Sequence, residues 1–224
     1  DLFGSGTLLC QAIERLSGIV PAENIFILTN HLQEAEVRRQ AVALPAENIV
    51  AEPARRDTAP AVALGIGLIA ARDPQANMII IPSDALITNA PAFRELAADA
   101  LSLAGRENAL ITIGIKPTWP CPSYGYIERA EKLHDAELTH NCYEVVRFRE
   151  KPDTATAEQY LASGNFSWNA GMFIWNVAHV RSQLAAHSPE LADFINRLTA
   201  TDELPAFITD EFPKLTPISI DFAL

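Results

Sequence analysis

A run of four apolar residues, Met78 to Ile81, constrains the fold of this chain more than any other segment. Pro82 stops the run, and its lack of polar alternation suits a strand that is covered on both faces. We therefore predict a central strand over residues 77–81, in a parallel sheet with helices packed on both sides. With 224 residues, the chain is long enough to bury the core of such an architecture.

Short β-rich segments alternate with amphipathic helical segments, which predicts an α/β protein with a mostly parallel sheet. Strands are expected at residues 24–28, 48–51, 77–81, 110–115, 124–128, 143–148 and 172–175, with 124–128 and 143–148 antiparallel to the others. Helices are expected at residues 7–17, 30–41, 59–71, 91–103, 155–161 and 177–200, the last broken near Pro189. Ser5 or Thr7, Asn30 and Thr58 can cap helix starts, and Gly164 can close the helix before it.

The amino-acid composition and charge of the chain argue against several classes of function. The formal net charge of −11 argues against binding to nucleic acid, which needs clustered Lys and Arg side chains. The longest apolar run, residues 61–71, is much shorter than the roughly 20 residues that cross a bilayer. The three cysteines are an odd number without a C-x-x-C pair, which favours reduced thiols over a disulfide framework. These observations predict a cytoplasmic protein with no membrane segment.

Two carboxylates are candidates for a metal site. Asp84 follows the predicted strand 77–81 through Pro82-Ser83, and ligands of open α/β sheets collect at the carboxyl ends of strands. Asp221 also follows a short apolar stretch and is a candidate second anchor. Mg²⁺ prefers few protein carboxylates together with substrate phosphates. The alternative is structural: Asp84 caps a turn, and Asp221 is a solvated residue near the chain end.

The polar loop from Glu52 to Pro60 leads into an apolar helix and is a candidate nucleotide site. A helix start offers unpaired N–H groups and a partial positive charge, which suits phosphate groups or base edges. Arg56 adds positive charge, while Glu52 or Asp57 could accept a hydrogen bond from a purine amino group. A capped helix with a cluster of solvated charges explains the same residues.

Three later segments carry side chains that suit a sugar phosphate. Glu150-Lys151-Pro152 ends a strand, where a Lys can meet a phosphate and a Glu can accept from sugar hydroxyls. Tyr124-Gly125-Tyr126 places a glycine between aromatic rings, which allows a ligand to approach the backbone closely. Trp168-Asn169-Ala170-Gly171 combines a stacking surface with an amide. An ion pair at a strand end, a glycine bulge and a turn are the respective structural alternatives.

In their order along the chain, these segments resemble the mannose-1-phosphate guanylyltransferase family, the GDP-mannose pyrophosphorylases. Residues 52–61 resemble the family's E-P-x-x-R-N-T-A-P-A segment, and residues 82–84 resemble the start of P-S-D-H. The match continues through Gly114-Ile115-Lys116-Pro117-Thr118, Tyr124-Gly125-Tyr126-Ile127, Glu150-Lys151-Pro152, Trp168-Asn169-Ala170-Gly171-Met172-Phe173 and Ser219-Ile220-Asp221. These collinear matches are specific for the family and less specific for the sugar.

The resemblance implies one nucleotidyltransferase domain over residues 1–224, of Rossmann-like (GT-A-like) α/β type, with a nucleotide-binding half up to about 118 and a sugar-phosphate-binding half from about 119. It implies that GTP and mannose 1-phosphate react, with Mg²⁺, to give GDP-mannose and pyrophosphate. The catalytic residues would be Asp84, Lys151 and Asp221, with the metal on Asp84 and Asp221. The nucleotide would contact Glu52, Arg56, Asp57, Thr58, Pro82 and Ser83, and the sugar phosphate would contact Tyr124, Gly125, Glu150, Lys151, Asn169 and Gly171. A homodimer is the one assembly considered, and the sequence does not fix the oligomeric state.

The chain departs from the family pattern in three ways. The family's Asn is Asp57 here, and Ala85 follows Asp84 where a His is usual. The family also begins with a strand and a G-G-x-G-T-R-L-x-P-L-S…P-K loop around the triphosphate and often has a C-terminal extension, so we expect a chain truncated at both ends relative to it. We expect these residues alone to lack a central strand and to be weakly active or inactive. The alternatives are a transferase for UTP or dTTP with glucose 1-phosphate, or a non-catalytic paralogue that binds a sugar nucleotide and regulates a partner.

Overall fold

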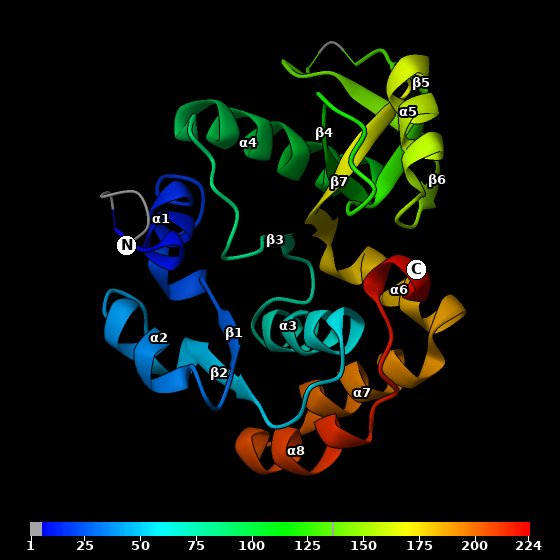
Figure 1. Ribbon diagram of the computed structural model, residues 1–224. Coiled ribbons are helices and arrows are strands. Elements are labelled where there is room, and N and C mark those ends of the chain that lie inside the picture. The colour runs from blue at the N-terminus through cyan, green and yellow to red at the C-terminus, as the bar shows by residue number, and fades with distance from the viewer. Residues whose placement is uncertain (1–5, 136) are drawn as a thin grey trace.

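Figure 1 shows the computed structural model, which describes residues 6–135 and 137–224. The helices are α1 (Leu8–Arg15), α2 (Glu34–Gln40), α3 (Thr58–Arg72), α4 (Ala90–Glu107), α5 (Thr154–Ser163), α6 (Val177–His187), α7 (Pro189–Ala200), α8 (Leu204–Glu211) and α9 (Ile220–Ala223). The strands are β1 (Ile27–Asn30), β2 (Ile49–Glu52), β3 (Asn77–Ile80), β4 (Ile111–Ile115), β5 (Tyr126–Leu133), β6 (Cys142–Arg149) and β7 (Phe166–Asn176). Short 3₁₀ helices occur at Ala22–Asn24 (η1), Ala46–Asn48 (η2) and Phe212–Lys214 (η3). The α/β class expected from the sequence is confirmed.

The long strand β7 organises the larger sheet. Trp168 of β7 pairs with Tyr126 of β5 and with Ile115 of β4, so these two strands flank β7. β3 also pairs with β7, and β6 adds to the outer edge of β5. Every described pairing in this sheet is antiparallel. β6 therefore runs opposite to β3 and β4, as expected, whereas β5 runs in the same direction as β3 and β4, so the orientation expected for β5 was wrong.

The prediction of a mostly parallel sheet around residues 77–81 was wrong. Among the described strands, only β1 and β2 pair in parallel. The physical reason is that β7 lies between β3 and β4 and runs in the opposite direction to both. β3 and β4 therefore each pair antiparallel with β7 and do not pair with each other. The sequence pattern indicated only residues 172–175 of β7, whereas the strand begins at Phe166.

Helices cover both faces of β3 and β7. Met78 and Trp175 pair across the two strands and belong to a buried apolar cluster with α3, α6 and α7. Ile79 and Ile174 also pair, and they contact the buried face of α4 in a second cluster. The prediction that the apolar run at residues 77–81 is covered on both faces is therefore confirmed.

Polar side chains set the helix starts close to the expected positions. Thr7 caps α1 as predicted, whereas Ser5 lies outside the described residues. Asn30 accepts a hydrogen bond within the turn that precedes α2, so it shapes this turn and does not cap the helix. α3 is capped by Asp57, and Thr58 is the first residue of the helix rather than its cap. Gly164 closes α5 in a left-handed conformation, as predicted.

Several element boundaries differ from the prediction. β1 begins at Ile27 because residues 22–24 form η1. The helical segment 177–200 divides into α6 and α7 at Ser188, which confirms the break expected near Pro189. α8 was not predicted, although Pro205 stands in its first turn, where proline is tolerated.

β1 and β2 form a separate two-stranded sheet, and no described strand joins it to β3. The two parts meet instead through an apolar cluster that includes Ile49 of β2, Phe93 of α4 and Met172 of β7. Figure 1 shows β3 between the β1–β2 part and the part that contains β4 to β7. Within residues 6–135 and 137–224, no helix is both long enough and apolar enough to cross a membrane.

Candidate active site

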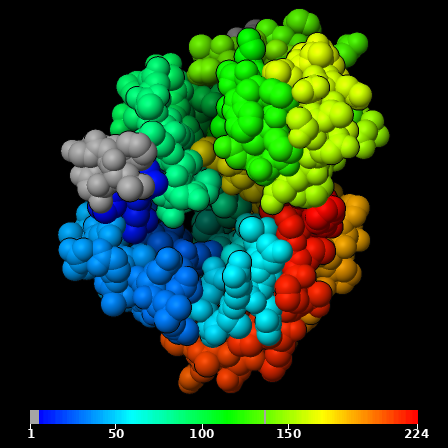
Figure 2. All heavy atoms as spheres, viewed as in Figure 1, coloured from blue at the N-terminus to red at the C-terminus, as the bar shows by residue number. Residues whose placement is uncertain are grey.

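Several predicted site residues lie at or just after the ends of strands, whereas Asn169 and Gly171 lie within β7 and Asp221 lies in α9. The nucleotide loop follows β2 at Glu52, and the loop with Asp84 follows β3 at Ile80. Figure 2 shows a hollow on this face of the molecule, bordered by the β1–β2 region in blue, the start of α3 in cyan and the chain end in red. Segments from both halves of the chain therefore meet around one open cleft.

Asp57 and Thr58 connect the nucleotide loop to the far end of the chain. Asp57 accepts a hydrogen bond from the Thr58 N–H at 2.7 Å, and its backbone φ of 66° is uncommon outside glycine. Such backbone strain often persists at functional positions. Thr58 Oγ1 accepts from the Ile220 N–H at 2.9 Å and donates to Ser219 Oγ at 3.4 Å. The start of α3 and residues 218–221 thus form one unit.

Asn169 joins this unit to the strands of the second half. Its Nδ2 donates to Asp221 Oδ1 at 3.1 Å, and its Oδ1 accepts from the Gly171 N–H at 2.9 Å. Its backbone N–H donates to the Gly125 carbonyl at 2.8 Å. The register of β7 against β4 shifts at this point, and such a bulge re-aims the side chains beside it. Four predicted site residues from three segments are therefore brought together.

The carboxylate of Asp221 has a pKa that its surroundings in this site change in both directions. Burial raises its pKa above the usual range, and the neighbouring carboxylates of Glu150 and Asp57 raise the pKa further. Hydrogen bonds from Asn169 and Ser219 act in the opposite direction. A half-buried acid among like charges is a place where a divalent cation would be stabilising, because the positive charge offsets the repulsion between the carboxylates.

Asp84 is exposed on the loop after β3, and within the described residues it has no hydrogen-bond or ion-pair partner. The adjoining carbonyl of Ala85 accepts a hydrogen bond from Arg15 Nη2 at 2.8 Å. Arg15 is 2% exposed and lies over the ring of Phe93, so α1 holds this loop from the interior. The structure therefore fixes the backbone beside Asp84 and leaves its carboxylate free. No group of three or more metal-ligating side chains occurs among the described residues.

The nucleotide loop contains two further predicted residues with different surroundings. Burial raises the pKa of Glu52, which is half-buried at the end of β2. Arg56 donates from Nε to the Pro213 carbonyl at 2.8 Å, and its Nη2 contacts the same oxygen. Arg56 thus ties the loop to η3, and its contact with a nucleotide stays a prediction. In the loop after β3, Pro82 is half-buried and Ser83 is exposed.

Glu150 and Lys151 follow β6 as an exposed pair, and no described residue forms an ion pair with either side chain. Lys151 thus presents an uncompensated positive charge, which suits a phosphate group. Gly125 lies between the Arg149 carbonyl and the Asn169 side chain, and an added methyl group would meet each at 3.7 Å, an ordinary contact. The protein itself does not require glycine at residue 125, so close approach of a ligand is the better reason for it.

Aromatic rings line the same region. Tyr124 contacts Trp168 edge-to-face with ring centroids 5.3 Å apart, and Trp119 contacts both rings. Trp119 and Tyr124 are 51% and 47% exposed, whereas Trp168 is 9% exposed. The Trp168 Nε1–H is buried, and no described residue accepts its hydrogen bond. This cluster offers a stacking surface with one unused donor.

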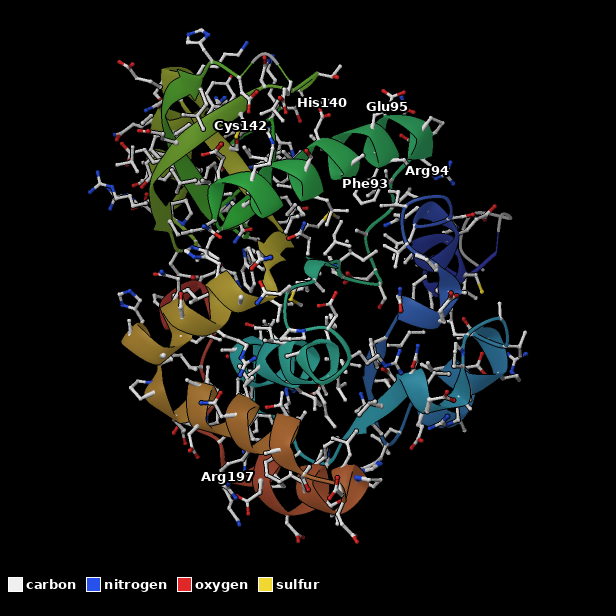
Figure 3. All side chains as sticks on the ribbon, turned by 180° about the vertical axis from the view of Figure 1, so that it is seen from behind. Phe93, Arg94, Glu95, His140, Cys142 and Arg197 are labelled. Atoms are coloured by element: carbon white, nitrogen blue, oxygen red, sulfur yellow. The ribbon has the colours of Figure 1, made fainter. Side chains whose placement is uncertain are left out.

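A large cavity of the molecule lies elsewhere. It has a volume of ≈ 1520 Å³ between α4 and the β5–β6 hairpin, and none of the predicted site residues lines it. On the hairpin side it is bordered by His140 and Cys142 (Figure 3), and His140 Nδ1 is paired with Asp99 of α4 at 2.6 Å. We place the candidate active site where Thr58, Asn169 and Asp221 are brought together, because hydrogen bonds join these three segments and the carboxylates of Glu150 and Asp57 act on Asp221.

Comparison with known proteins decides the family. The model of the family "Nucleotidyl transferase" matches residues 2–212, which is nearly the whole chain. The chain belongs to this family. Its α/β fold and the convergence of segments at one cleft agree with that assignment.

Similar proteins of this nucleotidyl transferase family are longer. Mannose-1-phosphate guanylyltransferases of Klebsiella pneumoniae and Escherichia coli are 36% and 35% identical to the whole chain, which covers 48% of each. A crystal structure described as mannose-1-phosphate geranyltransferase from Thermus thermophilus matches 99% of the chain with a TM-score of 0.86 and 30% identity, and 62% of that chain is covered. The chain thus spans about half the length of the curated relatives it matches.

Three residues around the site of this nucleotidyl transferase chain were not predicted to act there. Ser219 Oγ donates to Asp221 Oδ2 at 3.3 Å and connects Thr58 to this carboxylate, and its place in the matched segment 219–221 was a usable signal. Trp119 follows directly on the matched segment 114–118. No sequence pattern indicated a role for Arg15, because a buried Arg cannot be distinguished from a surface Arg in the sequence of an amphipathic helix.

We expect Thr58→Val to lower the free energy of unfolding of this nucleotidyl transferase chain by about 1–2 kcal/mol, because the buried Ile220 N–H would lose its acceptor. Urea denaturation followed by circular dichroism measures this change. Thr209→Val is the matched control, since Thr209 Oγ1 donates only to the Pro205 carbonyl within α8. Equal effects of the two substitutions would contradict the bridging role of Thr58.

Proposed function

We propose that this chain is the nucleotidyl-transfer region of an enzyme that makes GDP-mannose and pyrophosphate from GTP and mannose 1-phosphate. The observation that carries the proposal is the link from Asn169 to Asp221, which joins the nucleotide loop, the strand ends and the chain end at one cleft. The similarity to mannose-1-phosphate guanylyltransferases over the whole chain supports this choice of substrates.

In this reaction an oxygen of the sugar 1-phosphate attacks the α-phosphorus of GTP. The new bond joins this oxygen to the α-phosphorus, and the bond from the α-phosphorus to the oxygen that bridges to the β-phosphorus breaks. That oxygen keeps the electron pair and leaves as part of pyrophosphate. Catalysis of such a step consists mainly of alignment and of stabilising the negative charge that develops on the phosphate oxygens.

The side chains at the cleft fit Mg²⁺. Hard oxygen ligands suit this ion, and Asp84 and Asp221 would hold it, one as an exposed free carboxylate and the other as a half-buried carboxylate with a raised pKa. When bound, Mg²⁺ would supply positive charge to the reacting phosphates. The like-charged neighbours of Asp221 favour such a cation, because each of them raises the cost of leaving Asp221 ionised and alone.

The other residues of the site would bind the nucleotide or the sugar phosphate according to their positions. The loop from Glu52 to Thr58, together with Pro82-Ser83, would hold the nucleotide. Side chains of the loop would make these contacts, because at the start of α3 the Thr58 and Ala59 N–H groups are already bonded to Asp57 and to the Ile218 carbonyl. Lys151 would meet the sugar phosphate as a point charge, and Glu150 would accept from sugar hydroxyls. Asn169 would orient Asp221, and the ring of Tyr124 would stack on the sugar.

A substrate panel tests the proposal. The protein that contains these residues, with whatever flanking sequence its gene encodes, is assayed for Mg²⁺-dependent pyrophosphate release. GTP, UTP, dTTP and ATP are each paired with mannose 1-phosphate and glucose 1-phosphate. We expect release confined largely to GTP with mannose 1-phosphate.

The other outcomes distinguish the alternatives. Release mainly from UTP or dTTP with glucose 1-phosphate would replace the proposed substrates by those of a different sugar-nucleotide transferase. No release by a folded protein that still binds GDP-mannose would favour a non-catalytic regulator. The 224 residues alone form a useful comparison, because we expect them to be weakly active or inactive.

A further inference from the structure

The loop that carries Asp84 has very few polar contacts with the rest of the protein. It connects the end of β3 to the start of α4. Within the described part of the chain, residues 82–88 take part in a single hydrogen bond, in which Arg15 Nη2 donates to the Ala85 carbonyl at 2.8 Å. Because Ala85 directly follows Asp84, the one polar anchor of this loop lies beside the proposed metal ligand.

Apolar contacts also hold the loop, but they do so in a different way. Ala85 and Ile87 pack against the buried cluster that contains Leu16 and Phe93. Apolar contact is non-directional, so it keeps the loop against the core without fixing the orientation of a peptide group. A hydrogen bond from a planar guanidinium does fix a direction. Arg15 is therefore the contact that can set how the backbone presents Asp84.

Arg15 is itself held firmly at the junction of α1 and α4. It is 2% exposed, and its guanidinium lies 5.9 Å from the centre of the Phe93 ring. Arg94 Nε donates to the Arg15 carbonyl and Arg94 Nη2 to the Glu14 carbonyl, each at 3.2 Å. Figure 3 shows Phe93 and Arg94 on the part of α4 that lies beside α1. A donor whose backbone and side chain are both restrained can position the group that it contacts.

The stability of the fold does not explain an arginine at this position. No acidic side chain of the described residues pairs with Arg15, and its buried Nη1 has no acceptor among them. Burying a charge and an unused donor costs stability, which an unbranched apolar side chain such as methionine would avoid. The contact with the Ala85 carbonyl is therefore the better reason for Arg15.

We propose that Arg15 is a positioning residue, which acts through the Ala85 carbonyl to hold Asp84 in the orientation that binds the metal. This proposal rests on the metal role proposed above for Asp84. Charge and positioning predict opposite effects of removing Arg15. A cation near a metal site repels the metal, so loss of its charge alone would tighten metal binding. Loss of positioning would weaken binding, by about tenfold or more for residues that orient metal ligands.

Binding of Mn²⁺ alone, measured from the electron paramagnetic resonance signal of the free ion, tests the proposal without substrates. Mn²⁺ takes the same carboxylate ligands as Mg²⁺. We expect Arg15→Met to weaken Mn²⁺ binding by about tenfold. Arg72→Met is the matched control, because Arg72 also ends a helix, lies over the ring of Phe26 and donates to a backbone carbonyl, that of Glu23. It should leave Mn²⁺ binding unchanged.

A double-mutant cycle identifies the residue through which Arg15 acts. In a chain that already carries Asp84→Ala, Arg15→Met should cause no further loss of Mn²⁺ binding, because the ligand that Arg15 positions is gone. Arg15→Lys keeps the charge without the planar fork, so it should also weaken binding. This variant decides the test where Arg15→Met fails to fold, and unchanged binding by it would then contradict the proposal.

The remaining outcomes separate this proposal from the proposed function. Tighter or unchanged Mn²⁺ binding by folded Arg15→Met, an equal loss in Arg72→Met, or a further loss on top of Asp84→Ala would overturn the positioning role alone. If Asp84→Ala bound Mn²⁺ as tightly as the unmodified protein, the metal role of Asp84 would be wrong, and the role of Arg15 with it. Because no nucleotide or sugar takes part, these results do not depend on which substrates the enzyme uses.

Discussion

Replacing Asp221 with Asn should abolish nucleotidyl transfer and leave the fold at least as stable as before. We expect the rate of pyrophosphate release to fall by about 10³-fold, because a neutral amide cannot supply the negative ligand that Mg²⁺ requires. The fold should tolerate the change, since the amide can still accept from Asn169 and can donate to Ser219. A substitution that removes activity without lowering the free energy of unfolding identifies a side chain that serves the reaction at the expense of stability.

The expected stability follows from the raised pKa of Asp221. Because the folded protein holds this pKa above its unfolded value, folding favours the protonated carboxyl. The resulting stabilisation is complete below the unfolded pKa and is lost as the pH rises through the folded pKa. At neutral pH the ionised carboxylate therefore destabilises the metal-free protein relative to an uncharged side chain.

Denaturant titrations of both proteins between acidic and neutral pH, without Mg²⁺, measure this effect. The difference in free energy of unfolding, Asp221→Asn minus the unmodified protein, should grow as the pH rises and then level off. Asp210→Asn on the surface of α8 is the matched control and should show no such rise. A marked loss of stability in Asp221→Asn at neutral pH would show instead that the carboxylate serves the fold.

The sequence was a good guide wherever one segment decides its own structure. The apolar run at Met78 to Ile81 required cover on both faces, and the structure covers it with α4 on one side and α3, α6 and α7 on the other. Gly164 closes α5 because few other residues adopt its left-handed conformation so easily. In both cases the cause lies within a few residues, so it can be seen in the sequence.

The direction in which strands pair depends on residues far away in the sequence, and so do the hydrogen bonds that a side chain makes within the protein. Neither could be predicted from a single segment. An apolar run is equally compatible with parallel and antiparallel neighbours, and the direction of β7 decides the pairing of β3. Arg56 looked available for a nucleotide, yet the carbonyl that it contacts belongs to Pro213, far along the chain. The link between Thr58, Ser219 and Asp221 likewise depends on how the chain end returns to α3.

Replacing Asp84 with Ala should lower the activity about as much as Asp221→Asn does, but it should hardly change the stability of the fold. Asp84 is exposed, and within the described part of the chain it has no partner, so its removal should change the free energy of unfolding by less than about 0.5 kcal/mol. Pyrophosphate release should nevertheless fall by about 10³-fold, because one of the two proposed metal ligands is gone. Glu95→Ala, which removes an exposed carboxylate from α4 (Figure 3), should leave both quantities unchanged.

A change of metal preference can distinguish a ligand from a side chain that acts only through its charge. Asp84→Cys replaces a hard oxygen ligand by a sulfur ligand, which binds Mg²⁺ poorly and softer divalent ions well. We expect this variant to be nearly inactive with Mg²⁺ and to recover part of its activity with Cd²⁺, whereas Asp84→Ala should recover none. If Cd²⁺ restored both variants equally or neither of them, Asp84 would not be a direct ligand, and the role of Asp221 would have to be considered without it.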